Sequence, residues 1–144
     1  LESIDLITAR RREIFERYQH ELRALEDTQL IRLPRIPKNC LCNYHMFYVL
    51  LTNSQLRDTM LAHLRSEGIQ AAFHYVPLHE SPIGQTLGYQ TGDLPVTEDQ
   101  SARMARLPLF CELPRESQAR VVRVMKQFLE RVTIPSCSVT ARGA

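Results

Sequence analysis

Residues 45–76 read HMFYVLLTNSQLRDTMLAHLRSEGIQAAFHYV, and this stretch predicts a strand, a helix and a second strand in succession. Its first seven residues are mostly aromatic or branched, which favours a buried strand. Asn53 or Ser54 can cap the helix, whose apolar side chains recur at helical spacing at Leu56, Met60, Leu61 and Leu64. Gly68 lies where a helix commonly ends. The two predicted strands are residues 45–51 and 69–76.

The chain before this unit predicts one long helix and a short strand. Residues 4–25 form an amphipathic pattern, with apolar side chains at Ile7, Ile14, Tyr18, Leu22 and Leu25. Residues 30–33 predict a short strand. Pro34 and Pro37 then hold the backbone extended or turned.

The chain after this unit begins with a polar loop from Pro77 to about Val96. It is longer than the usual limit of about 12–15 residues, and loops of this length are often functional. Thr97 and Gln100 fit a capping box for a short helix. The remaining predicted segments are a strand or extended segment at 107–110, a helix at 115–132 and a small, polar tail at 133–144, which we expect to be disordered.

This order of elements predicts one α+β domain in which helices cover a small, mainly antiparallel sheet. With 44% hydrophobic residues the chain can bury a core, and a net charge of +2 without charge blocks gives no sign of a nucleic-acid or membrane-surface partner. No apolar run reaches the roughly 20 residues of a membrane helix. The sequence does not open with a signal peptide. We therefore expect a cytoplasmic protein with reduced cysteines.

Polar side chains that suit a ligand gather where the second predicted strand ends. His74, Tyr75 and His79 fall within six residues and offer both hydrogen-bond donors and acceptors. The alternative is a strand end whose polar side chains face water. His45 opens a hydrophobic strand and is either a core residue or a pocket residue. We expect His79 to be exposed and Phe73 to be buried.

Other kinds of site have weaker support. Cys40, Cys42 and His45 form a C-x-C-x-x-H pattern with three ligands, whereas structural zinc sites normally have four. We therefore expect no metal and interpret these cysteines as small hydrophobic residues. The two lysines, Lys38 and Lys126, lie in settings unlike that of a desolvated Schiff-base lysine. The sequence contains no Gly-rich phosphate loop.

Three segments carry a resemblance to a known family. NYHMFYVLL, LRSEGIQAAFHYVPLHESPIG and DLPVTEDQSARMARLPLF occur in this order at 43–51, 64–84 and 93–110. Together they resemble the C-terminal part of sugar-nucleotide aminotransferases of the DegT/DnrJ/EryC1/StrS family, over residues 1 to about 132. The resemblance implies the small domain of a fold-type-I aminotransferase, with pyridoxal phosphate at the interface of a homodimer.

The resemblance also implies roles for particular residues. Substrate-binding residues would be His45, near the cofactor, and His74, Tyr75 and His79, along the sugar-nucleotide pocket. The lysine that binds the cofactor belongs to the large domain of the family, so no catalytic residue is expected in this chain and we expect the chain alone to be inactive. The parent enzyme would transfer an amino group from glutamate to a nucleotide-linked 4-keto-6-deoxy sugar.

Two other interpretations stay open. The chain could be a stand-alone α+β module that binds a ligand or a partner without catalysis. A weaker alternative is a zinc-binding module that uses Cys40, Cys42 and His45.

Overall fold

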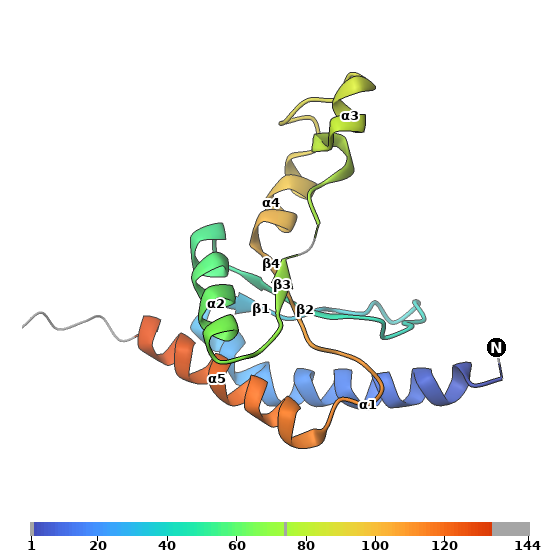
Figure 1. Ribbon diagram of the computed structural model, residues 1–144, viewed down its shortest axis with the longest axis vertical. Coiled ribbons are helices and arrows are strands. Elements are labelled where there is room, and N and C mark those ends of the chain that lie inside the picture. Colours follow the sequence, from blue (N-terminus) through green and yellow to red (C-terminus); the bar gives the residue numbers. More distant parts are fainter. Residues whose placement is uncertain (1, 74, 134–144) are drawn as a thin grey trace, which may run out of the picture.

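The computed structural model describes residues 2–73 and 75–133 (Figure 1). Three long helices pack against a small sheet, and the segment between the third and fourth strands projects from this body. The helices are α1 (Ile4–Leu22), α2 (Ser54–Ser66), α3 (Pro82–Thr86), α4 (Pro95–Arg103) and α5 (Arg115–Thr133), with 3-10 turns η1 (Arg23–Thr28) and η2 (Leu78–Glu80). The strands are β1 (Ile31–Arg32), β2 (Phe47–Leu51), β3 (Ala72–Phe73) and β4 (Met104–Leu107).

The four strands form one antiparallel sheet in the order β1-β2-β4-β3. In β2, Phe47, Val49 and Leu51 are fully buried, as expected from its aromatic and branched residues. The ring of Phe47 contacts the rings of Phe15 and Tyr18 on α1, at centroid distances of 5.0 Å. The α+β class with a small antiparallel sheet is therefore confirmed.

Helix α2 begins and ends where the sequence predicts. The side chain of Asn53 accepts a hydrogen bond from the backbone N–H of Leu56 at 2.8 Å, which is the predicted N-cap. Gly68 has φ of +71°, and Ile69 donates its N–H to the carbonyl of Leu64 at 2.8 Å. Glycine adopts this left-handed conformation without a steric cost, so the chain reverses here toward β3.

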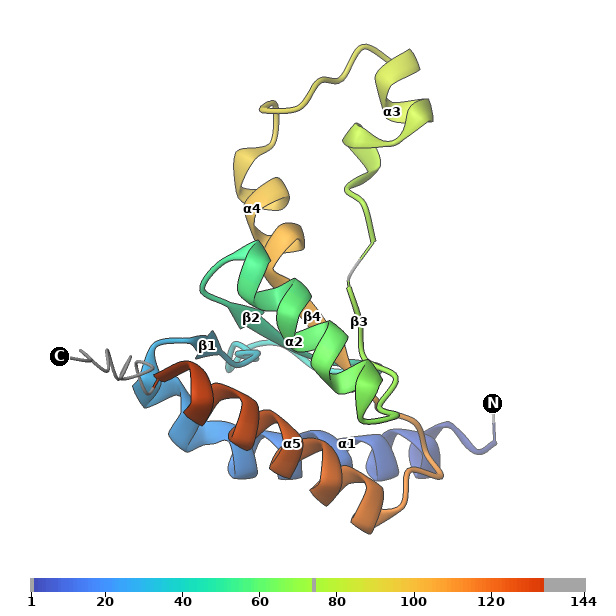
Figure 2. The same ribbon diagram turned by 60° about the vertical axis from the view of Figure 1, so that its left-hand side comes forward.

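Helices α1 and α5 lie side by side, and α2 crosses near them (Figure 2). Side chains from all three close the core with β2 and β4; they include Tyr18, Leu22, Met60, Leu64, Met125 and Leu129. The helical spacing of α5 predicts an apolar face, and all of its members are buried except Val132, which is 44% exposed at the end of the helix; the members are Val121, Val124, Met125, Phe128, Leu129 and Val132. Thr133, assigned to the tail from sequence, is helical, and the rest of that tail, with Cys137, lies outside the described residues.

Several predicted boundaries are wrong, and the sheet explains why. The fourth strand is Met104–Leu107 rather than residues 107–110, because Pro108 cannot donate to the ladder. The strand predicted at 69–76 is limited, among the described residues, to Ala72–Phe73, which pairs with β4 at the edge of the sheet. At this edge Phe73 is 54% exposed, so the expected burial of Phe73 is wrong.

The helices and the first strands also differ from the prediction in extent. The long first helix ends at Leu22 and continues as η1, although Leu25 is still buried. The strand predicted at 30–33 is limited to Ile31–Arg32. The strand predicted at 45–51 begins at Phe47, because Tyr44 has φ of +51° and turns the backbone just before it. Helix α4 begins at Pro95, with Leu94 as N-cap, so the capping box at Thr97 and Gln100 is not formed.

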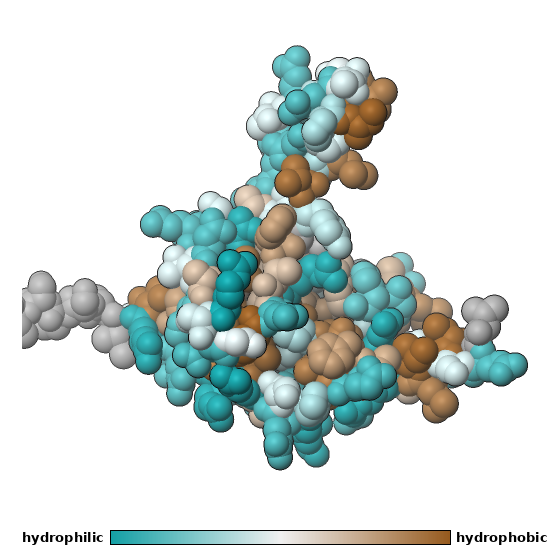
Figure 3. Space-filling model, viewed as in Figure 1, coloured by the Kyte–Doolittle hydropathy of each residue, from teal (hydrophilic) through white to brown (hydrophobic). Residues whose placement is uncertain are grey.

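The segment predicted as a loop contains η2, α3 and the start of α4. We call residues 77–94 the arm. The arm extends away from the sheet in both views, and α4 connects its returning end to the body (Figures 1 and 2). Apolar patches cover part of its surface (Figure 3). None of the helices in the described part of the chain is both long and apolar enough to span a bilayer.

Candidate functional site

A pocket of about 470 Å³ lies where β3 leads into the arm. We call it the arm-base pocket. Its walls come from four parts of the chain: α2, the end of β3, the start of the arm and α4. The lining residues are Arg57, Asp58, Phe73, Tyr75, Val76, Pro77, Glu80, Glu98, Ser101 and Ala102. Apolar and aromatic side chains next to a few charged groups are typical of small-molecule sites.

Tyr75 brings an aromatic ring to this pocket. It is 70% exposed, and the guanidinium carbon of Arg106 lies 5.9 Å from the centre of its ring. A cation over an aromatic face at this distance is weakly attractive. Because Arg106 belongs to β4, this contact joins Tyr75 to the sheet. Tyr75 therefore adds an aromatic face and a hydroxyl to the lining of the pocket.

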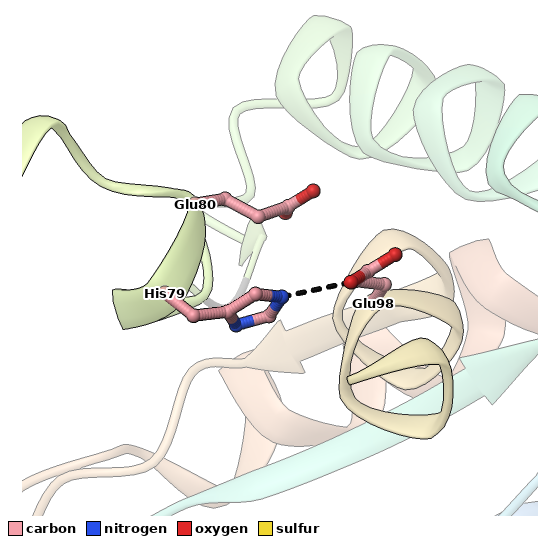
Figure 4. A group of neighbouring side chains, drawn as sticks. All are labelled: His79, Glu80 and Glu98. Atoms are coloured by element: carbon pink, nitrogen blue, oxygen red, sulfur yellow. Dashed lines mark hydrogen bonds and ion pairs between the residues drawn. The ribbon is translucent and has the colours of Figure 1, made fainter. Parts of the chain in front are cut away.

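His79 does not lie on the surface, so its expected exposure is wrong. It is 6% exposed, and its Nε2 lies 2.8 Å from Oε1 of Glu98 (Figure 4). An ionised carboxylate only accepts hydrogen bonds, so Nε2–H of His79 donates. The same Oε1 accepts the backbone N–H groups of Gly92 at 2.8 Å and Leu94 at 3.3 Å. The hydrogen bond from His79, followed by that from Gly92, lowers the pKa of Glu98 below its ordinary value.

Glu80 lies next to this pair. The ligand atoms of His79, Glu80 and Glu98 are within 4.8 Å of one another, and within the described residues this is the one group of three or more that could hold a metal ion. Glu80 also accepts a hydrogen bond from the hydroxyl of Thr91 at 3.2 Å. The direct bond between His79 and Glu98 already satisfies two of the three groups, so the geometry is explained without an ion.

Arg57 supplies the positive charge of the arm-base pocket. Its side chain is 14% exposed, and its Nε lies 2.7 Å from Oδ1 of Asp58 in an ion pair. The direction of the N–H is unsuitable for a hydrogen bond, and Nε has no such partner in the described part of the chain. With Asp58, Glu80 and Glu98 the lining carries three carboxylates against one guanidinium, so a group with positive character is favoured over a bare anion.

His45 lies in a different pocket. This second pocket has a volume of about 370 Å³, and Phe15, Cys42, Asn43 and Tyr48 are among its lining residues. His45 is exposed, and its Nδ1 lies 2.7 Å from Oδ1 of Asn43. A series of contacts across the sheet runs between residues of the two pockets: Tyr48 is paired with Arg106, and Arg106 contacts Tyr75.

Four substrate-binding residues are expected from sequence, and among the three that the structure describes, Tyr75 lines the arm-base pocket. His79 lies behind its wall, His45 lies in the second pocket, and His74 lies outside the described residues. Sequence reasoning missed Glu98, Arg57 and Arg106. A charged residue on a predicted helix or strand usually indicates a solvated face, so no local pattern distinguished these three.

The cysteines do not gather with His45. Cys40 is exposed at a turn, and Sγ of Cys42 accepts the backbone N–H of Tyr44 at 3.3 Å. Cys40, Cys42 and His45 do not form a group of converging ligand atoms. The geometry therefore gives no support to the zinc interpretation.

The two lysines do not fit a covalently held pyridoxal phosphate. Lys38 is exposed in the turn before β2, and Nζ of Lys126 lies 3.8 Å from Oε2 of Glu21 between α5 and α1. A Schiff-base lysine is usually desolvated or placed beside another cation. Lys38 is exposed, and Lys126, although it lines a pocket with Arg115 and Arg123, is only partly buried and is paired with a carboxylate. Neither environment therefore suits the covalent role.

Comparison with known proteins agrees with this fold. The family model described as the DegT/DnrJ/EryC1/StrS aminotransferase family matches residues 1–126. A dTDP-3-amino-3,4,6-trideoxy-alpha-D-glucose transaminase from Micromonospora megalomicea subsp. nigra is 30% identical over 132 residues, which cover 90% of this chain and 34% of the relative. The chain thus spans about a third of the length of that relative.

Solved structures show the same correspondence. S. venezuelae DesV is 28% identical with a TM-score of 0.81, covering 90% of this chain and 34% of that one. The aminotransferase TlmJ from Streptoalloteichus hindustanus is 26% identical with a TM-score of 0.79, covering 91% of this chain and 34% of that one. On the family match over most of its length, the chain belongs to the DegT/DnrJ/EryC1/StrS aminotransferase family.

Proposed function

We propose that residues 1–132 are the C-terminal small domain of a pyridoxal-phosphate-dependent sugar aminotransferase. The parent enzyme would transfer an amino group from glutamate to a nucleotide-linked 4-keto-6-deoxy sugar, as a homodimer. The substrate would be similar to that of a dTDP-4-amino-4,6-dideoxygalactose transaminase, an enzyme of surface-polysaccharide synthesis. Family membership supports the reaction class, and the relative that is a dTDP-sugar transaminase supports the substrate class.

The arm-base pocket is the observation that carries this proposal. Its polar and aromatic lining suits the sugar part of the substrate, which has both hydroxyl groups and apolar faces, whereas its three carboxylates disfavour the diphosphate, which in the proposal lies outside this pocket. In the proposal Tyr75 contacts the sugar part of the sugar nucleotide, His74 is a second contact, and His45 approaches from the second pocket. His79 contributes from behind the pocket wall through Glu98.

Bound pyridoxal phosphate would supply the electron sink that amino transfer needs. Because Lys38 and Lys126 do not fit the covalent role, we propose that the cofactor lysine belongs to the part of the relatives that this chain does not span. This chain would bind and enclose the substrate, and no catalytic residue is assigned to it.

The test is an assay of amino transfer from glutamate to a dTDP-linked 4-keto-6-deoxy sugar, followed by mass spectrometry. The full-length protein should form the amino sugar, and the 144-residue chain alone should not. Activity of the chain alone would overturn the assignment of a small domain. Lack of reaction with any nucleotide-linked keto sugar by the full-length protein would favour the alternative, a binding module without catalysis.

A further inference from the structure

The arm has little support from the hydrophobic core. It projects from the body in both ribbon views, and several of its apolar side chains are largely exposed; these include Leu78 at 83%, Ile83 at 66% and Leu87 at 72%. A segment with so little burial needs other interactions to offset the entropy that is lost when its backbone becomes fixed. The polar contacts at the base of the arm therefore decide its position.

The outer half of the arm is held together by local contacts. Ser81 accepts the backbone N–H of Gly84 at 3.2 Å and donates its hydroxyl to the carbonyl of Leu78 at 2.6 Å. Helix α3 lies so close to η2 that a Cβ added at Gly84 would be 2.3 Å from the carbonyl oxygen of Leu78. Residues 78–84 of the arm thus behave as one unit. The orientation of this unit depends on the two connections between the arm and the body.

Both connections meet at one carboxylate oxygen. Oε1 of Glu98 accepts Nε2–H of His79 from the outgoing side of the arm, and it accepts the N–H groups of Gly92 and Leu94 from the returning side. The side chains of His79 and Glu98 are only 5% and 18% exposed. Hydrogen bonds to an ionised group are stronger than neutral ones, and the shielding from water strengthens them further.

Helix α4 transmits this attachment to the sheet. Glu98 lies on α4, and Arg103 on the same helix donates a hydrogen bond to the carbonyl of Leu51 in β2 at 3.0 Å. The same helix lines the arm-base pocket through Glu98, Ser101 and Ala102. The position of the arm and the shape of this pocket therefore depend on the same residues.

We propose that Glu98 is a positioning residue, which holds both ends of the arm against α4 and thereby keeps the arm-base pocket shaped for its substrate. The role in substrate binding rests on the proposed function, whereas the role in ordering the arm does not. Glu98 acts through His79 and the backbone of residues 92–94. It does not need to contact the substrate.

The ordering role can be tested on the 144-residue chain by NMR hydrogen exchange. In Glu98→Ala the amides of Gly92 and Leu94 should exchange roughly ten- to a hundredfold faster than in the unmodified chain, because their acceptor is lost. Glu98→Gln keeps an acceptor oxygen and should restore much of the protection. Asp99→Ala is the matched control, because Asp99 is paired with Arg103 and does not contact the arm.

Unchanged exchange at Gly92 and Leu94 in Glu98→Ala would overturn the proposal, and so would equal acceleration in Asp99→Ala. If Glu98→Ala does not fold, the comparison of Glu98→Gln with Asp99→Asn decides whether Glu98 orders the arm. Both variants replace a carboxylate by an amide on α4. In that comparison the two amides should exchange moderately faster in Glu98→Gln, because a neutral oxygen is a weaker acceptor than a carboxylate, and should be unchanged in Asp99→Asn.

The positioning role can be tested in the full-length protein. Glu98→Ala should raise the KM for the sugar nucleotide about tenfold and should change kcat much less. Glu98→Gln should bring the KM most of the way back to that of the unmodified protein. An equal fall in kcat with unchanged KM would contradict the positioning role. If no transamination is found at all, the proposed function fails, while the exchange result on Gly92 and Leu94 still decides whether Glu98 orders the arm.

Discussion

Tyr18 on α1 donates its phenolic hydrogen to the carbonyl oxygen of Pro108, at 3.0 Å, across 90 residues of chain. Tyr18 is completely buried, and this burial raises the pKa of its hydroxyl, which therefore stays protonated as a donor. Gln118 makes a second such bond, from Nε2 to the carbonyl of Ile14 at 2.7 Å. Helix α1 is thus hydrogen-bonded both to the loop after β4, at Pro108, and to α5, at Gln118. These bonds stabilise the body from which the arm projects.

Tyr18→Phe should lower the free energy of unfolding by about 1–3 kcal/mol, because it leaves the carbonyl of Pro108 without its partner. Urea denaturation followed by circular dichroism measures the change. Tyr89→Phe, at a residue of the arm that is 48% exposed, should lie within about 0.5 kcal/mol of the unmodified chain. A change in the free energy of unfolding for Tyr18→Phe as small as that expected for Tyr89→Phe would show that the hydroxyl of Tyr18 contributes no stability.

Phe47→Ala should destabilise the chain by about 3–5 kcal/mol, because it removes a fully buried ring from the core. Phe73→Ala should cost clearly less, since Phe73 is 54% exposed at the edge of the sheet. The same urea experiment on both variants gives the comparison. A loss for Phe73→Ala as large as that for Phe47→Ala would mean that Phe73 is buried in solution.

The contribution of Glu98 to stability should disappear in acid. Its pKa in the folded chain is lowered, first by the hydrogen bond from His79 and then by that from Gly92. The contribution is therefore complete above the pKa of an unfolded glutamate, roughly 4.3, and is lost as the pH falls through the lower pKa of the folded state. Glu80 and Arg57 line the same pocket, and both are identical in the unmodified chain and in the Glu98→Gln variant that is compared with it.

The measurement is the Tm of the unmodified chain and of Glu98→Gln between about pH 7 and pH 3, a range that spans the titration of Glu98. The gap between the two proteins should be largest near neutral pH and should narrow in acid, because the amide in Glu98→Gln does not titrate. A gap that is constant over this range would show that the charge of Glu98 adds no stability to the fold.

Tyr75→Ala in the full-length protein should raise the KM for the sugar nucleotide by roughly two- to tenfold, the value of one hydrogen bond with some stacking. The Tm should stay close to that of the unmodified protein, because Tyr75 is 70% exposed. Tyr89→Ala, a substitution of the same size outside the pocket, is the control. If both variants have unchanged kinetics, Tyr75 does not bind the substrate.

The 144-residue chain should not bind pyridoxal phosphate as a stoichiometric imine. Its lysines are exposed in a turn, at Lys38, or paired with Glu21, at Lys126. The test adds the cofactor, reduces with borohydride and maps the label by mass spectrometry. Complete labelling at one of these two lysines, with the other unmodified, would mean that the chain has its own cofactor site.

Much of the fold follows from local patterns that are visible in the sequence. The cap at Asn53, the left-handed turn at Gly68 and the apolar faces of α2 and α5 each depend on residues within a few positions of one another. The α+β class follows from the order of these elements. The sequence also predicts a candidate site near Tyr75, because polar side chains and prolines follow a hydrophobic run there.

Only the tertiary structure decided what individual residues do at that site. Two residues that are adjacent in the sequence motif, Leu78 and His79, differ completely in exposure, at 83% and 6%. His79 becomes buried because the chain returns nineteen positions later and places Glu98 beside it. Hydrogen bonds of this kind join residues that are distant in sequence, and their partners are chosen by the path of the backbone in space, which no local pattern of side chains contains.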